Sequence, residues 1–116
     1  MFEYLVNKLN DYDLAYLHFI CLTEKGEHPQ KSIFEFAKHY REIYKGTFII
    51  NGGFLKESAE KALEENLADL ISFGVPFIGN PDLVQRFAVD APLNKADSDT
   101  FYVPGAKGYT DYPALK

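Results

Sequence analysis

Cysteine is almost absent from this chain of 116 residues. The single one, Cys21, excludes an internal disulfide and a cysteine-based zinc cluster, and it fits a reducing compartment. No apolar stretch approaches the ~20 residues that a membrane span needs. The first residues also lack the basic and apolar regions of a signal peptide. We therefore expect a cytoplasmic protein without a membrane partner.

Positive charge is also scarce. The chain has 17 acidic and 12 basic residues, a formal net charge of −5, and no run of lysine and arginine. Such a balance disfavours binding to nucleic acid or to an anionic membrane surface. The apolar share of 47% is ordinary for a folded protein, and the length suits one domain, so a large two-domain enzyme is excluded.

Helix-like and strand-like segments alternate along residues 1–91. Apolar residues recur at helical spacing in four segments, at 2–9, 32–44, 55–65 and 83–88. Three strand-like runs lie between them, at 14–22, 47–50 and 67–73. The first run is nearly all apolar, which is typical of a strand covered on both faces. Asn80 and Pro81 predict an N-cap and the first position of the last helix.

This order of elements predicts an α/β fold with a parallel sheet. Strands separated by helices are joined by right-handed crossovers, which place the strands parallel. Three parallel strands make a small sheet with two open edges, which another chain could pair with. We therefore expect a partner, either a second copy of the chain or a complementary part of a larger sheet. Residues 92–116 lose all periodicity and predict an irregular tail.

Two glycine-bearing turns follow the second and third predicted strands. They are Asn51-Gly52-Gly53 and Phe73-Gly74. Ligands of parallel α/β folds bind at the carboxyl ends of the strands, and glycine lets backbone N–H groups approach a phosphate closely. Glycine also permits tight turns without any ligand. Spacing alone leaves both interpretations open, phosphate binding and a purely structural turn.

Five segments, taken in order, carry a resemblance to a known family. They are LAYLHF, YKGTFIINGGF, ADLISFGVPFIGNPDLVQRF, PLN and TFYVPGAKGYTDYP. Together they resemble the C-terminal part of the old yellow enzyme family, which are FMN-dependent ene-reductases on a (β/α)8 TIM barrel. The resemblance covers residues 2–113 and makes the three strands similar to barrel strands six, seven and eight. It implies a single partial-barrel domain at 1–116, with βα units in 1–91 and the irregular tail in 92–116.

The resemblance implies a set of cofactor-binding residues in the two turns. Gly52, Gly53 and Phe54 match the family's turn after strand seven, which holds the flavin phosphate through backbone amides. Phe73 and Gly74 match the turn after strand eight.

At the next position, Val75 stands where the family usually has an arginine that contacts the cofactor. The absence of this arginine removes a charge-assisted hydrogen bond to the cofactor, worth roughly 1.5–3 kcal/mol. In the tail, Tyr102 matches a tyrosine that lines the substrate pocket. Taken without the resemblance, Tyr102 would instead anchor the tail with a buried ring.

The resemblance also implies a function. In the family, FMN takes a hydride from NAD(P)H and passes it to an activated alkene. The upstream strands of the family carry the flavin-ring contacts, the substrate anchors and the proton donor, so no catalytic residue is assigned to this chain. We expect it to supply the flavin-phosphate cradle and one wall of the active site, with weak or absent FMN binding in isolation. Two alternatives remain: a catalytically silent phosphate-binding module, and an α/β interaction protein without flavin chemistry.

Metal sites are not predicted. His18 and Cys21 lie three residues apart in a strand-like run, so their side chains point to opposite faces. Asp97, Asp99 and Asp111 resemble a calcium site in composition, but the segment lacks the glycine and the distal glutamate of a calcium-binding loop.

Overall fold

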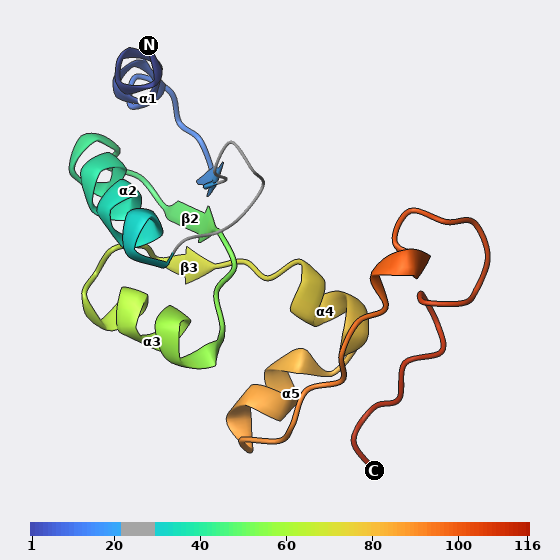
Figure 1. Cartoon of the computed structure of the whole chain (residues 1–116). Helices are drawn as coiled ribbons and strands as arrows, with labels where there is room; N and C mark the ends of the chain where they lie inside the picture. The colour runs from blue at the N-terminus through green and yellow to red at the C-terminus, as the bar shows by residue number, and fades with distance from the viewer. Residues whose placement is uncertain (22–29) are drawn as a thin grey trace. The chain divides into compact units, whose positions relative to one another are not determined.

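The computed structural model describes residues 1–21 and 30–116 (Figure 1). These residues form two compact units, Met1–Ser72 and Phe73–Lys116. The first unit carries the sheet and the longer helices, and the second carries short helices and the tail. None of the helices in the described part is both long and apolar enough to cross a membrane.

A parallel three-stranded sheet lies at the centre of the first unit. Its strands are β1 (Leu17–Ile20), β2 (Phe48–Asn51) and β3 (Leu70–Ile71), in the order β1-β2-β3. Leu17 is paired with Phe48, and Ile49 is paired with Leu70. The predicted parallel α/β arrangement is confirmed.

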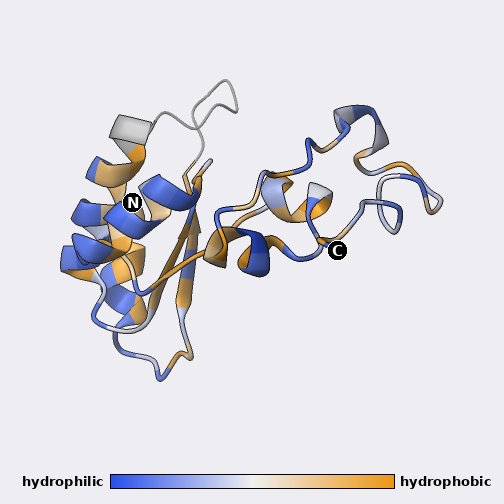
Figure 2. Cartoon of the chain, turned by 90° about the horizontal axis from the view of Figure 1, so that it is seen from below, coloured by the Kyte–Doolittle hydropathy of each residue, from blue (hydrophilic) through white to orange (hydrophobic). Residues whose placement is uncertain are grey.

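Three helices belong to the first unit: α1 (Phe2–Leu9), α2 (Gln30–Ile43) and α3 (Lys56–Glu64). Their bounds match the predicted helices closely, because amphipathic spacing is a local signal. Figure 2 shows these helices on one face of the sheet. Phe48 and Ile50 point to this face and are 0% exposed. The ring of Phe19 packs there too, 4.8 Å from the ring of Tyr40.

The opposite face of the sheet, called the open face below, is only partly covered by the described residues. His18, Ile49 and Leu70 are register partners and so share this face. Ile20 and Leu70 are 58% and 54% exposed. Strand β1 is shorter than the strand predicted at 14–22, and the helices of this unit cover one of its faces. Cover of its other face stays a prediction, which requires a partner. Leu22 lies outside the described residues.

Helices α4 (Val75–Gly79) and α5 (Leu83–Ala88) and the short helix η1 (Ser98–Thr100) belong to the second unit. The predicted N-cap at Asn80 is wrong, since α5 begins two residues later than expected and Asp82 precedes it. The Asn80 side chain is instead fully buried. It donates to Pro76 O at 2.9 Å and accepts from the N–H of Asn94 at 2.7 Å, so this amide holds the tail.

Arg86 is the second anchor of the tail. This buried guanidinium donates to Pro92 O at 2.6 Å and to Pro113 O at 2.9 Å, and it pairs with Asp82 at 2.8 Å. Hydrogen bonds from the N–H of Leu115 and from Arg86 hold the pKa of Asp82 below its ordinary value. These bonds fix the tail within its own unit.

Candidate functional site

The turn after β2 places three of the predicted site residues together. Gly52 is buried, and a Cβ at this position would collide with the Ile33 side chain of α2. Gly53 has φ 66, a left-handed conformation that favours glycine. Phe54 is 2% exposed and lies 6.3 Å from the ring of Phe34. The fold itself therefore requires Gly52 and Gly53, as the structural interpretation of the turn expects.

Gly74 is different from these two glycines. Its φ is −92, outside the left-handed region that favours glycine, and its ψ is −86. A Cβ built there would meet no atom of the described residues within 4 Å. Neither a left-handed φ nor packing in the described chain explains a glycine at this position. Open space where a side chain would stand is what a cradle for a ligand requires.

The residues on either side of Gly74 have separate environments. The ring of Phe73 packs edge-on against Phe87 at 5.2 Å. Val75 begins α4 and is 55% exposed. Its side chain offers no donor to an anion, unlike the arginine that the resemblance places there.

A polar network joins the carboxyl ends of β2 and β3 and reaches the side chain of His18 in β1. The Asn51 amide donates to Ser72 O at 2.8 Å and to Ser72 Oγ at 3.0 Å. His18 Nε2 lies 2.7 Å from the same Ser72 Oγ. The ends of β2 and β3, from which the two glycine turns emerge, are thus linked directly. Sequence reasoning missed this network, although the polar residues Asn51 and Ser72 at the ends of β2 and β3 were a visible signal.

Cys21 follows β1 at the same end of the sheet. Its backbone N–H donates to Asn51 O at 2.9 Å. Burial raises the pKa of the Cys21 thiol, so the thiol stays protonated at neutral pH and is a weak nucleophile. Within residues 1–21 and 30–116, no group of three histidine, cysteine, aspartate or glutamate side chains could hold a metal ion.

Tyr102 lies in the tail, directly after the residues of η1 and Phe101. It is 97% exposed and has φ 59. The alternative of a tail anchor with a buried ring is therefore wrong. A left-handed backbone at a tyrosine costs of order 1–2 kcal/mol, which the rest of the tail must offset. Its assignment to the substrate pocket stays a prediction.

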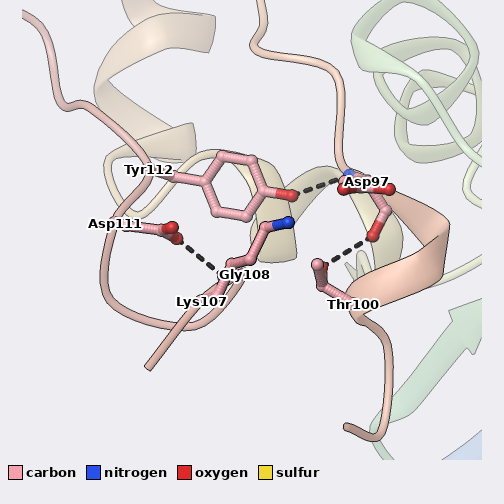
Figure 3. A pocket seen from close by; sticks show the side chains of 6 residues that line it. All are labelled: Asp97, Thr100, Lys107, Gly108, Asp111 and Tyr112. Atoms are coloured by element: carbon pink, nitrogen blue, oxygen red, sulfur yellow. Dashed lines mark hydrogen bonds between the residues drawn. The ribbon is translucent and has the colours of Figure 1, made fainter. Parts of the chain in front are cut away.

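A small pocket lies within the tail (Figure 3). Its volume is about 180 Å³, below the ~300–1,000 Å³ typical of sites for drug-sized ligands. The Tyr112 hydroxyl accepts from the N–H of Asp97, and Asp111 accepts from the N–H of Gly108, both at 2.7 Å. These bonds tie the tail to itself. The lining residues are Asp97, Thr100, Lys107, Gly108, Asp111 and Tyr112, so the pocket does not include Tyr102.

Solved structures resemble this chain closely. A variant of NCR from Zymomonas mobilis has a TM-score of 0.84 and 38% identity, and the match covers 99% of this chain and 37% of that one. Morphinone reductase in complex with tetrahydroNAD has a TM-score of 0.83 and 40% identity, over 98% of this chain and 30% of that one. The fold is therefore part of a TIM barrel, as predicted.

Curated relatives agree with the structures. A 12-oxophytodienoate reductase-like protein of Solanum lycopersicum is 44% identical over 114 residues, which are 97% of this chain and 30% of the relative. The 12-oxophytodienoate reductase 2 of Arabidopsis thaliana is 42% identical over 120 residues, with 97% and 30% covered. The chain spans about 30% of the length of these relatives. The profile of the NADH:flavin oxidoreductase / NADH oxidase family matches residues 1–94, and the chain belongs to this family, with the old yellow enzymes.

Proposed function

We propose that this chain supplies the flavin-phosphate cradle and one wall of the active site of an FMN-dependent ene-reductase. By the family resemblance, the residues of the cradle are Gly52, Gly53, Phe54, Phe73, Gly74 and Val75. Tyr102 belongs to the substrate wall. The FMN, when bound, would supply hydride transfer from NAD(P)H to an activated alkene.

The space at Gly74 carries this proposal. Gly52 and Gly53 are explained by packing and by φ, whereas Gly74 has no such role among the described residues. A phosphate held by backbone N–H groups needs close approach, and a side chain would prevent that approach. Membership in the flavin oxidoreductase family supports the choice of the FMN phosphate as the anion.

The open face of the sheet supports the second part of the proposal, a complementary partner. A TIM barrel fills its interior with side chains from all its strands. Here Ile20 and Leu70 stand more than half exposed on the face that would point inward. We propose that polypeptide equivalent to the remaining strands of the relatives completes the barrel, or that a second copy covers this face.

A substitution of Gly74 tests the cradle directly. The variant Gly74→Ala should change the melting temperature little, because the φ of Gly74 is not left-handed and the Cβ would meet no described atom within 4 Å. The same methyl group should weaken binding of FMN, measured by quenching of flavin fluorescence, more than it weakens binding of riboflavin, which lacks the phosphate. Equal FMN affinity in the variant and the unaltered chain would contradict the cradle.

The size of the FMN affinity separates the functional alternatives. We expect the isolated chain to bind FMN weakly and to show no ene-reductase turnover with an enone and NADPH, since no catalytic residue is assigned to it. Turnover comparable to a complete old yellow enzyme would contradict the proposal that the catalytic residues lie outside this chain. Absence of any FMN or phosphate binding would favour an interaction protein without flavin chemistry.

A further inference from the structure

Asn51 occupies the last position of β2, immediately before the glycine turn. Its side-chain amide donates two hydrogen bonds to Ser72, at 2.8 Å to the backbone O and 3.0 Å to Oγ. Ser72 in turn immediately precedes Phe73 and Gly74 in the chain. One amide group therefore connects the two strand ends from which both proposed phosphate-binding turns emerge.

This connection adds to a very short backbone ladder. Strand β3 has only two residues, and the last backbone bond between the two strands runs from the N–H of Ser72 to Ile50 O at 3.0 Å. Beyond that bond, the side chain of Asn51, rather than the backbone, links the end of β2 to Ser72. The Ser72 hydroxyl accepts from Asn51 and can donate its own proton to an unprotonated His18 Nε2, 2.7 Å away. The ends of β2 and β3 are held together in this way and are also linked to His18 within β1.

We propose that Asn51 is a positioning residue, which fixes the turn at 52–54 relative to the end of β3 at Ser72. Both hydrogen bonds of its side-chain NH2 group go to Ser72. Asn51 would therefore affect the ligand indirectly, by holding the turn at 52–54 that follows it. The inference rests on the proposed function, because it concerns the affinity of those turns for the phosphate of FMN. Without the amide, the backbone donors of the first turn would sample orientations that no longer converge on one anion.

The test compares FMN and riboflavin binding in the full chain and in Asn51→Ala. The ratio of the two dissociation constants isolates the phosphate, because both ligands share the flavin ring. We expect Asn51→Ala to lose about fivefold to tenfold of the preference for FMN, the equivalent of one or two lost hydrogen bonds. Ser72→Ala, which keeps the backbone acceptor and removes only Oγ, should lose less. In a chain that already carries Gly74→Ala, the further substitution Asn51→Ala should lower the preference for FMN only slightly.

Asn10 provides a matched control. Its side-chain amide also makes two backbone hydrogen bonds, to Ile43 O at 2.9 Å and from the N–H of Lys45 at 2.8 Å, near the beginning of β2. Asn10→Ala should lower the melting temperature while leaving the FMN-to-riboflavin ratio unchanged. If the ratio is unchanged in Asn51→Ala and Ser72→Ala as well, the positioning role is refuted while the cradle stands. If the unaltered chain binds FMN no better than riboflavin, the cradle itself fails, and this inference fails with it.

Discussion

The carboxylate of Asp69 fastens the amino-terminal end of the sheet, and its removal should destabilise the first unit. Its Oδ2 accepts from the backbone N–H of Phe48 at 2.8 Å and from Arg41 Nη1 at 2.6 Å, and its Oδ1 accepts from Arg41 Nη2 at 3.0 Å. This bidentate pair links α2 to the starts of β2 and β3. We compare two perturbations, Asp69→Ala and Asp69→Asn.

The expected loss of unfolding free energy depends on which partners of Asp69 each variant leaves without a hydrogen bond. Phe48 is 0% exposed, and a buried N–H left without a partner costs about 1–3 kcal/mol. The Arg41 pair is partly exposed, so solvent screening limits it to about 0.2–1 kcal/mol. Asp69→Ala loses both and should lower the free energy of unfolding by about 1–4 kcal/mol. Asp69→Asn keeps an oxygen for Phe48 and should lose only the smaller part.

Urea unfolding followed by circular dichroism measures both values, and the pH dependence adds an independent check. Burial raises the pKa of Asp69, but the Phe48 N–H and the Arg41 guanidinium outweigh it, so the pKa lies below its ordinary value. The carboxylate therefore contributes stability above pH ~3.9, the ordinary value, and that stability is lost as the pH falls through the folded-state pKa. The difference between the unaltered chain and Asp69→Asn should shrink below about pH 4. A difference that is constant from neutral to acid pH, or an Asp69→Ala variant as stable as the unaltered chain, would refute the reasoning.

Three further predictions follow from other parts of the chain. Val75→Arg should tighten FMN binding about tenfold or more by restoring a charge-assisted bond, measured by fluorescence titration; no gain would contradict the correspondence with the family arginine. Gly108→Ala should lower the free energy of unfolding by about 2–4 kcal/mol in denaturant titration, since φ is 78 and the Cβ would collide with Thr100; Gly105→Ala, at φ 116 with no described atom nearby, measures the strain alone. Light scattering coupled to size exclusion should show self-association of the isolated chain, and a compact monomer that melts cooperatively would contradict it.

The elements that could be predicted from the sequence are those with a local signal. Helices α1, α2 and α3 follow amphipathic periodicity, and the strands follow short β-branched and aromatic runs. Helix α4 was not predicted, because five residues containing Pro76 show no period and resemble a chain break. Proline is tolerated in the first turn of a helix, so this signal was ambiguous rather than absent.

Some features of the candidate site could likewise be predicted from local sequence, and others could not. Glycine turns are a local signal, and the turn at 51–54 and the Gly74 position lie where the sequence predicted them, at the ends of strands β2 and β3. The links among Asn51, Ser72 and His18 depend on strand register, which brings together residues 21 to 54 positions apart in sequence. Arg86 likewise finds its carbonyl partners through the path of the tail. Pairings of this kind are decided by tertiary packing, which periodicity does not describe.

The open face of the sheet connects the fold to the proposed partner. It combines apolar side chains, Ile20, Ile49 and Leu70, with the polar group formed by Asn51, Ser72 and His18. Full burial of each large aliphatic side chain is worth about 1.5–3 kcal/mol, and two of the three are more than half exposed. Covering them would therefore add about 2–4 kcal/mol, a substantial share of the 5–15 kcal/mol that typically stabilises a domain. A partner surface for this face must be mainly apolar, as the other strands of a barrel are, and must leave the polar group at the carboxyl edge satisfied. The same association would thus stabilise the sheet, and under the proposed function we expect FMN binding to rise with stability when the partner is added.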